Sequence, residues 1–206
     1  VASGQGMTNV YVQRITNGQP MYVFYGQEFL GFDEDGMAQY ADTSTYLGSP
    51  HPDFSWGLGA KLKYKIFRLD VFMEGKHGQT VYNNTANSIG NMGNLRNAYN
   101  TFVSTLESGA SPQNPIQFSS RYLEDGSFIR LSDVKLSVEL PVSKINGIQH
   151  ASWYVKGSNL IVLTDYSGYD PDVHTSAGSG SVNSMGIDNS TYPKARIYTT
   201  GLSITF

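Results

Sequence analysis

The stretch R-I-Y-T-T-G-L-S-I-T-F, residues 196–206, separates into two different faces when it is read as a β-strand. Side chains of a strand point alternately to opposite faces, so residues two positions apart share a face. One face is largely apolar and consists of Tyr198, Leu202, Ile204 and Phe206, whereas the other is small and mostly polar. A strand of this kind ending on an aromatic residue is typical of the closure and assembly strand of an outer-membrane β-barrel. An ordinary sandwich strand that ends in Phe is the alternative.

The stretch F-S-W-G-L-G-A-K-L-K-Y (Phe54–Tyr64) alternates in the same way. Its length matches the roughly 9–11 residues that a tilted strand needs to cross a bilayer. Aromatic residues at both ends and aliphatic residues between them are expected of a lipid-facing band flanked by interfacial girdles. We therefore predict that Phe54, Trp56, Leu58, Ala60, Leu62 and Tyr64 face lipid, and that Lys61 and Lys63 face the barrel interior. A soluble hairpin with one buried and one wet face is the alternative.

Three more strands can be placed from similar alternation. A tight turn at Lys65-Ile66 leads into a return strand, and the next strand changes phase near Ser132-Asp133, which predicts a β-bulge there. An Asn146-Gly147 turn signal then precedes a strand from about residue 150 to 164. The chain thus holds five antiparallel strands that can be placed, plus one to three of undetermined direction within residues 1–50.

Two long segments, residues 75–126 and 165–195, are rich in Asn, Ser, Gly and Asp. Loops of this length are uncommon in compact domains and usually functional, and in outer-membrane barrels the long loops are extracellular. The spacing of Leu95, Tyr99, Phe102 and Leu106 predicts one short amphipathic helix in the first segment. Aromatic residues of the two segments are candidate contacts for a substrate or partner: Tyr82, Tyr99, Phe102, Tyr166 and Tyr169. The alternative is that these rings pack the loops against themselves.

Composition narrows the class of protein. Charged residues make up 15% of the 206 residues, below the roughly 25% of soluble domains, and the net charge is −3. This charge provides no basic surface for nucleic acid. The chain has no cysteine and no run of about 18 apolar residues, so neither a disulfide framework nor a transmembrane helix is expected. The first residue, Val1, indicates that this chain is a piece of a longer protein.

No pattern in the sequence predicts catalysis. The four histidines, His51, His77, His150 and His174, are widely separated and lack the spacing of a metal site. No G-x-S-x-G nucleophile motif occurs, and the aspartates of the second long segment read as solvated loop acids. We therefore expect no enzymatic activity, no metal site and no cofactor.

Five signatures, in order, resemble one family. They are G-Q-P-M-Y-V-F-Y-G-Q-E-F-L-G (18–31), G-S-P-H-P-D-F-S-W-G-L (48–58), Y-L-E-D-G-S-F-I-R-L-S-D-V-K-L-S (122–137), S-N-L-I-V-L-T-D-Y-S-G-Y-D-P-D-V (158–173) and Y-P-K-A-R-I-Y-T-T-G-L-S-I-T-F (192–206). Their order and spacing resemble the C-terminal part of SusC/RagA-type TonB-dependent outer-membrane transporters of Bacteroidota. The acidic stretch before the second signature is shorter than is usual in the family, so no calcium site is carried over.

The resemblance implies a fold and a function. Residues 1–206 would be the last strands of a plugged transmembrane β-barrel of about 22 strands, with the plug domain absent from this chain. The whole protein would be a multi-pass protein of the cell outer membrane that imports oligosaccharides or peptides. Its partners would be a SusD-like surface lipoprotein, TonB acting through the missing N-terminal part, outer-membrane lipid and the N-terminal remainder of the transporter. We also expect that deletion of Phe206 lowers the assembled population.

Two other functions remain open at this point. The first is a stand-alone outer-membrane barrel of about eight strands with an adhesive or structural role. The second is a soluble carbohydrate-binding β-sandwich that uses Tyr- and Trp-rich loops. The three hypotheses differ in what should lie against the apolar faces of the strands: lipid in either barrel, and a second sheet in the sandwich.

Overall fold

The computed structural model describes residues 11–97, 99–143, 145, 147–173 and 184–206. The chain divides into two compact units whose segments alternate in sequence. The first unit comprises Val1–Asp53, Gly78–Ser127 and Asp165–Tyr192, and the second comprises Phe54–His77, Phe128–Thr164 and Pro193–Phe206.

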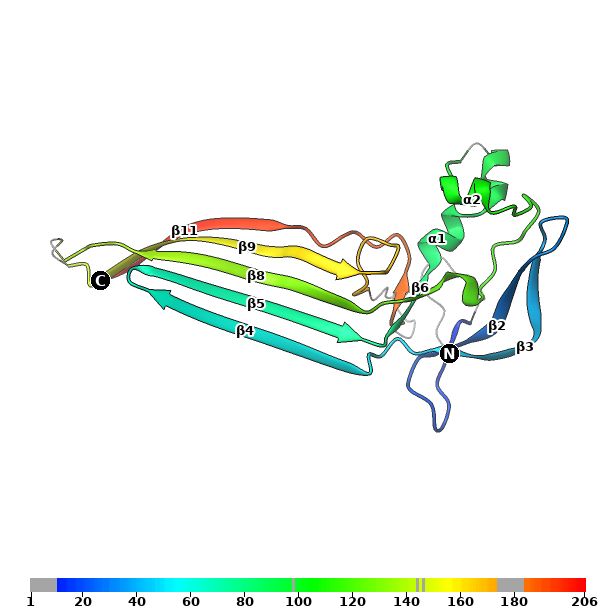
Figure 1. Ribbon diagram of the computed structural model, residues 1–206, viewed down its shortest axis with the longest axis horizontal. Coiled ribbons are helices and arrows are strands. Elements are labelled where there is room, and N and C mark those ends of the chain that lie inside the picture. The colour runs from blue at the N-terminus through cyan, green and yellow to red at the C-terminus, as the bar shows by residue number, and fades with distance from the viewer. Residues whose placement is uncertain (1–10, 98, 144, 146, 174–183) are drawn as a thin grey trace. The chain divides into compact units, whose positions relative to one another are not determined.

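The second unit is a five-stranded antiparallel sheet, seen as long neighbouring ribbons in Figure 1. Its strands are β4 (Phe54–Tyr64), β5 (Phe67–His77), β8 (Phe128–Glu139), β9 (His150–Thr164) and β11 (Ile197–Thr205). The spatial order β11-β9-β8-β5-β4 pairs each strand with the next of these strands along the chain. These are the five strands predicted from alternation, and β4 has the predicted bounds.

Short connections lie at one end of this sheet. A two-residue turn, Lys65-Ile66, joins β4 to β5, because Tyr64 pairs directly with Phe67. Lys65 has φ +53°, the left-handed conformation that tight hairpin turns commonly require. Residues 140–149 connect β8 to β9 at the same end. The Asn146 half of the predicted Asn146-Gly147 turn lies outside the described residues. The long segments 78–127 and 165–196 both leave from the opposite end of the sheet.

The predicted β-bulge is present in β8. Asp133 pairs with Phe72 of β5 and Leu131 pairs with Met73, so Ser132 has no partner in that ladder. On the β9 side the register shifts at the same place, between Leu131 and Asp133. The extra residue accounts for the change of phase in the sequence, because a residue inserted into a strand moves all later side chains to the other face.

The pairing register joins the apolar positions of all five strands into one face. One cross-strand row runs Tyr64, Phe67, Val138, Trp153, Leu202, and the next runs Leu62, Leu69, Leu136, Val155, Thr200. The opposite face carries the rows Lys63, Arg68, Ser137, Tyr154, Gly201 and Lys61, Asp70, Lys135, Lys156, Thr199. Ion pairs on this charged face include Lys156 Nζ to Asp133 Oδ1 at 2.7 Å. The sheet therefore has one apolar face and one charged face.

In the part of the first unit that the structure describes, the strands form two small sheets. In one, β1 (Gln13–Arg14), β2 (Val23–Phe32) and β3 (Ala38–Gly48) are antiparallel. In the other, β6 (Thr80–Asn83) lies between β7 (Leu123–Asp125) and β10 (Ile187–Asp188). The strands predicted within residues 1–50 thus exist, and they form a sheet separate from the five long strands.

The described residues of the first unit also contain four short helices: α1 (Asn84–Ile89), η1 (Met92–Asn97), α2 (Val103–Glu107) and η2 (Ser120–Tyr122). Short helices thus occur in the long segment as predicted, but Leu95 and Leu106 lie in two of them and not in one helix. The Asn94 side chain donates to the backbone oxygens of Ser88 and Ile89, at 2.8 and 3.1 Å, and such side-chain bonds compete with a continuous helix.

The hydrophobic core of the first unit is small. Val12, Phe24, Tyr82 and Ile187 are fully buried together, and Leu47, Phe118, Tyr122 and Leu123 pack against them. The rings of Tyr82 and Phe118 meet edge to face with their centroids 4.9 Å apart. This core holds β6 and the start of α1 in place, and the residues that follow β6 line the cavity described next.

Candidate functional site

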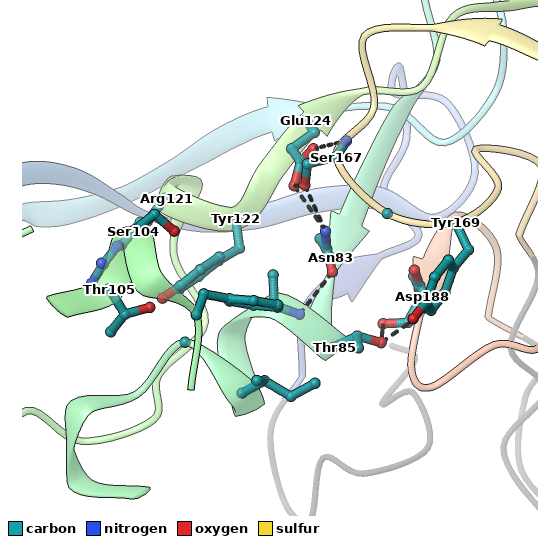
Figure 2. A pocket seen from close by; sticks show the side chains of 15 residues that line it. Asn83, Thr85, Ser104, Thr105, Arg121, Tyr122, Glu124, Ser167, Tyr169 and Asp188 are labelled. Atoms are coloured by element: carbon teal, nitrogen blue, oxygen red, sulfur yellow. Dashed lines mark hydrogen bonds between the residues drawn. The ribbon is translucent and has the colours of Figure 1, made fainter. Parts of the chain in front are cut away.

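A cavity of about 590 Å³ lies within the first unit (Figure 2). Its volume falls in the range of about 300–1,000 Å³ found for small-molecule sites. Its lining comes from α1, α2, η2, β7 and β10, from the end of β6 and from residues 167–169. The lining residues are Asn83, Thr85, Ala86, Ile89, Gly90, Phe102, Ser104, Thr105, Arg121, Tyr122, Glu124, Ser167, Gly168, Tyr169 and Asp188.

Asn83 ties three parts of the cavity wall together. As the N-cap of α1, its Oδ1 accepts a hydrogen bond from the Ala86 backbone N–H at 2.8 Å. Its Nδ2 donates to Glu124 Oε1 at 2.9 Å and to Ser167 Oγ at 3.1 Å. The Ser167 backbone N–H and hydroxyl also donate to the Glu124 carboxylate, at 2.7 and 2.8 Å. Glu124 is therefore held in one position by three neutral donors.

Asp188 forms a second fixed carboxylate, at the opposite side of Figure 2 from Arg121. It is only 4% exposed. Thr85 Oγ1 and the Thr191 backbone N–H donate to its Oδ1, at 3.1 and 3.2 Å, and Tyr166 OH donates to its Oδ2 at 2.7 Å. Burial raises the pKa of Tyr166, and the Asp188 carboxylate raises it further, so the phenol remains a donor at neutral pH.

Arg121 brings a positive charge to the cavity from η2. Its guanidinium carbon lies 4.6 Å from the ring centroid of Phe32, 5.0 Å from that of Tyr122 and 5.2 Å from that of Phe29. Cation–π contacts of this kind orient a guanidinium without using its N–H donors. Burial raises the pKa of Tyr122, an effect that the Arg121 charge reduces, so this phenol also stays protonated.

The aromatic residues predicted as contacts divide into three groups. Phe102 and Tyr169 line the cavity, and Tyr169 is largely exposed. Tyr99 is exposed but is not among the lining residues. Tyr82 and Tyr166 are buried and their rings fill the interior of the first unit, as expected if these aromatic residues pack the loops, and a contact role for them stays a prediction. Tyr82 accepts a hydrogen bond from Asn87 Nδ2 at 2.8 Å, so its polar end is also satisfied internally.

The residues predicted to face lipid lie on the apolar face of the sheet. In β4, Phe54, Leu58, Leu62 and Tyr64 are exposed, while Trp56 is half-buried because it lies over Gly75 of β5. In β11, Tyr198, Leu202 and Ile204 are exposed on the same face, and Phe206, beyond the strand's end, is also exposed. Contact with lipid, and the role of β11 in barrel closure, stay predictions.

Sequence reasoning did not single out the polar residues of the cavity. Arg121 directly precedes the Y-L-E-D-G signature and Glu124 lies within it, but Asp188 and Asn83 are distant from it in sequence. The available signal was the residue type at Asn83, because Asn is among the residues preferred as helix N-caps. Within the described part of the chain, no group of three or more His, Asp or Glu residues could hold a metal ion. No helix in that part is long and apolar enough to cross a membrane.

No protein-family model matches the chain. It is 32% identical over 193 residues to TonB-dependent receptor P3 of Formosa agariphila, a match that covers 88% of this chain and 19% of that receptor. It is 29% identical to TonB-dependent receptor P26 of the same organism, a match that covers 98% of this chain and 24% of that receptor. It is 24% identical to the TonB-dependent receptor SusC of Bacteroides thetaiotaomicron, a match that covers 92% of this chain and 18% of that receptor. The chain thus spans about a fifth of the length of these curated relatives.

The fold is similar to solved structures of the RagAB peptide importer. In the open-open state the TM-score is 0.78 at 25% identity, over 97% of this chain and 24% of that one. In the closed-closed state the TM-score is 0.73 at 23% identity, over 95% of this chain and 25% of the matched chain. The expected fold, an antiparallel β-barrel segment that is not closed by this chain alone, is confirmed. The relatives are receptors and transporters, which agrees with the expectation that the chain is not an enzyme. These matches support the SusC/RagA family of TonB-dependent outer-membrane transporters for this chain, which corresponds to part of the length of the family's members.

Proposed function

We propose that this chain is part of a TonB-dependent importer of the outer membrane, in which the five-stranded sheet forms a section of the barrel wall. The apolar face contacts lipid, and the charged face lines the interior next to the plug. Residues 1–206 are the C-terminal part of the barrel domain. The relatives named as TonB-dependent receptors support this assignment.

The observation that carries the proposal is the uncovered apolar face. Phe67 is 46% exposed, Leu136 45% and Trp153 45%, although each has an apolar partner on a neighbouring strand and paired strands on both sides. Large apolar patches on a monomer mark contact surfaces, and a sheet with this face in water would aggregate. Lipid is the solvent in which such a face is stable.

The two alternative functions fit less well. A sandwich requires a second sheet packed about 10 Å away on the apolar face, and within the described residues these side chains remain exposed. A stand-alone barrel requires β4 and β11 to pair with each other or with further strands. Both are instead the edges of the sheet in the described structure, and backbone groups at such edges cannot remain unpaired in lipid.

The substrate class and the partners are part of the proposal. RagAB is named as a peptide importer, which supports oligopeptides as one proposed cargo class, and oligosaccharides are the other. A SusD-like surface lipoprotein would cover the transporter outside, and TonB would act on the N-terminal remainder. The long segments 78–127 and 165–196 leave the sheet at one end, as expected of extracellular loops opposite short periplasmic turns.

A labelling experiment tests the orientation of the wall. The chain contains no cysteine, so Leu58→Cys and Lys61→Cys add defined reporters to it. In the full-length protein in cells, Leu58→Cys should resist a water-soluble maleimide and react with a lipid-soluble one, whereas Lys61→Cys should not react with the lipid-soluble reagent. The reverse pattern would contradict the proposal.

A transport experiment tests the activity. Uptake of labelled oligopeptides or oligosaccharides by cells that carry the full-length protein should stop when TonB is deleted. Uptake that continues without TonB would contradict the proposed energy source.

Protease added to intact cells should cut within 78–127 or 165–196. Cleavage there only after the outer membrane is disrupted would place these segments on the wrong side.

A further inference from the structure

The cavity of the first unit contains charges whose partners are missing from the described residues. The Arg121 guanidinium has five N–H donors, and none of them makes a hydrogen bond or ion pair with a described residue. Its contacts are with aromatic rings, which hold the side chain while leaving the planar fork able to bind a carboxylate with two parallel hydrogen bonds.

The acidic side of the cavity is equally incomplete. Glu124 and Asp188 each accept three hydrogen bonds from neutral donors, and a carboxylate offers about four acceptor positions. No Lys or Arg of the described residues lies within ion-pair distance of either carboxylate. A carboxylate that is 4% exposed, such as Asp188, is costly to bury without an opposite charge, so a cation entering the cavity would be stabilised there.

We propose that this cavity binds a small zwitterionic ligand, a short peptide with free ends, whose carboxylate pairs with Arg121 and whose ammonium group lies between Glu124 and Asp188. The inference rests on the proposed function in import and adds a substrate site to it. Arg121 and Asp188 lie on opposite sides of the view in Figure 2, which separates the two charged ends of the ligand. Phe102 and Ile89, which also line the cavity, supply apolar contact for side chains between the ends.

The charge pattern favours a peptide over a sugar. A neutral oligosaccharide would leave all three charges unpaired, and burying unpaired charges opposes binding. An acidic oligosaccharide would satisfy Arg121 but would bring a second negative charge close to Glu124 and Asp188. A free peptide provides both signs at its two ends.

Calorimetric titration of the full-length protein in detergent tests the site. The probes are tetra-alanine with free ends, its C-terminal amide and its N-acetyl form. Loss of a charge-assisted hydrogen bond corresponds to about a 10- to 100-fold change in affinity, so both modified peptides should bind that much more weakly than the free peptide. This comparison uses the unaltered protein and does not depend on the folding of a variant.

Arg121→Gln completes a thermodynamic cycle. The substitution should weaken binding of the free peptide by about the same factor as amidation of the peptide does. It should have little further effect on binding of the amidated peptide. Arg96→Gln is the matched control, because Arg96 is an exposed arginine of η1 that does not line the cavity, and it should change neither affinity. Equal affinity of the free and amidated peptides would overturn the proposal. Tighter binding of trigalacturonic acid than of the peptide would replace it with an acidic-sugar site.

The outcome can be separated from that of the proposed function, since calorimetry needs no TonB. TonB-dependent uptake without peptide binding would contradict the site alone. Peptide binding together with TonB-independent uptake would support the site and contradict the proposed energy source.

Discussion

Gly75 shows how a single residue shapes the sheet. It pairs with Trp56, and a Cβ placed on it would lie 2.5 Å from Cε2 and Nε1 of the indole. The ring therefore lies over the position where other residues carry a side chain. Gly59 occupies the same strand pair on the other face, but a Cβ there would meet Phe72 only at 3.8 Å. The two glycines thus have different roles although they share one local conformation.

We predict that Gly75→Ala lowers the free energy of unfolding by about 1–3 kcal/mol, because the indole must leave its position. Gly59→Ala should be neutral or slightly stabilising, by up to about 1 kcal/mol, since the methyl group fits and the unfolded chain loses freedom. Urea titration of the full-length protein in detergent measures both variants. Equal effects of the two substitutions would show that the ring does not need the space over Gly75.

Tyr166 provides a residue-scale test in the first unit. Its hydroxyl donates to the buried Asp188 carboxylate, whereas the Tyr169 ring is 79% exposed. Tyr166→Phe should lower the free energy of unfolding by about 1–3 kcal/mol, because a buried acceptor loses its donor. Tyr169→Phe should change it by less than about 0.5 kcal/mol. Thermal unfolding of both variants makes the comparison, and a larger effect at Tyr169 would contradict the structure.

At the scale of elements, the alternation of residues predicted strands better than it predicted helices. Phe54–Tyr64 alternates without interruption because a strand that separates two different environments must do so, and β4 has those bounds. The change of phase near Ser132 was readable for the same reason, and the bulge is there. The spacing from Leu95 to Leu106 indicated a helix correctly but not its bounds, since the two leucines lie in two short helices, η1 and α2, and both are exposed.

The two faces of β4 lead to a prediction with an internal control. Leu58→Arg should cost about 2–4 kcal/mol if Leu58 lies near the bilayer midplane, because the charge would enter lipid. Lys61→Arg introduces the same side chain on the charged face of the same strand and should change the free energy of unfolding by less than about 0.5 kcal/mol. Urea titration of the protein folded into lipid vesicles measures both. A harmless Leu58→Arg would place the apolar face away from lipid.

At the scale of the whole molecule, the edges of the large sheet are its unfinished feature. β4 pairs only with β5 and β11 only with β9 among the described strands. Each edge leaves a row of backbone N–H and C=O groups unpaired, which costs several kcal/mol per group in lipid. We infer that further strands of the same transporter pair with both edges.

Hydrogen exchange can test this inference. In the full-length protein, backbone amides along both edges of Phe54–Tyr64 and Ile197–Thr205 should be protected. In the isolated 206-residue chain, the outward-facing amides of these strands should exchange rapidly, and the chain should aggregate. A stable monomer with protected edges, formed from the isolated chain, would instead support a closed small barrel.

The sequence by itself determined the five long strands, the two-residue turn and the bulge, because each of these depends on residues that are neighbours in one strand or hairpin. The signatures also indicated the family. The cavity could not be derived in this way. Asn83, Glu124, Ser167 and Asp188 come from four distant places, and only the packing of β6 between β7 and β10 brings them together. The burial of Tyr82 and Tyr166 has the same origin, since loop composition does not reveal which aromatic ring fills a core formed by long-range contacts.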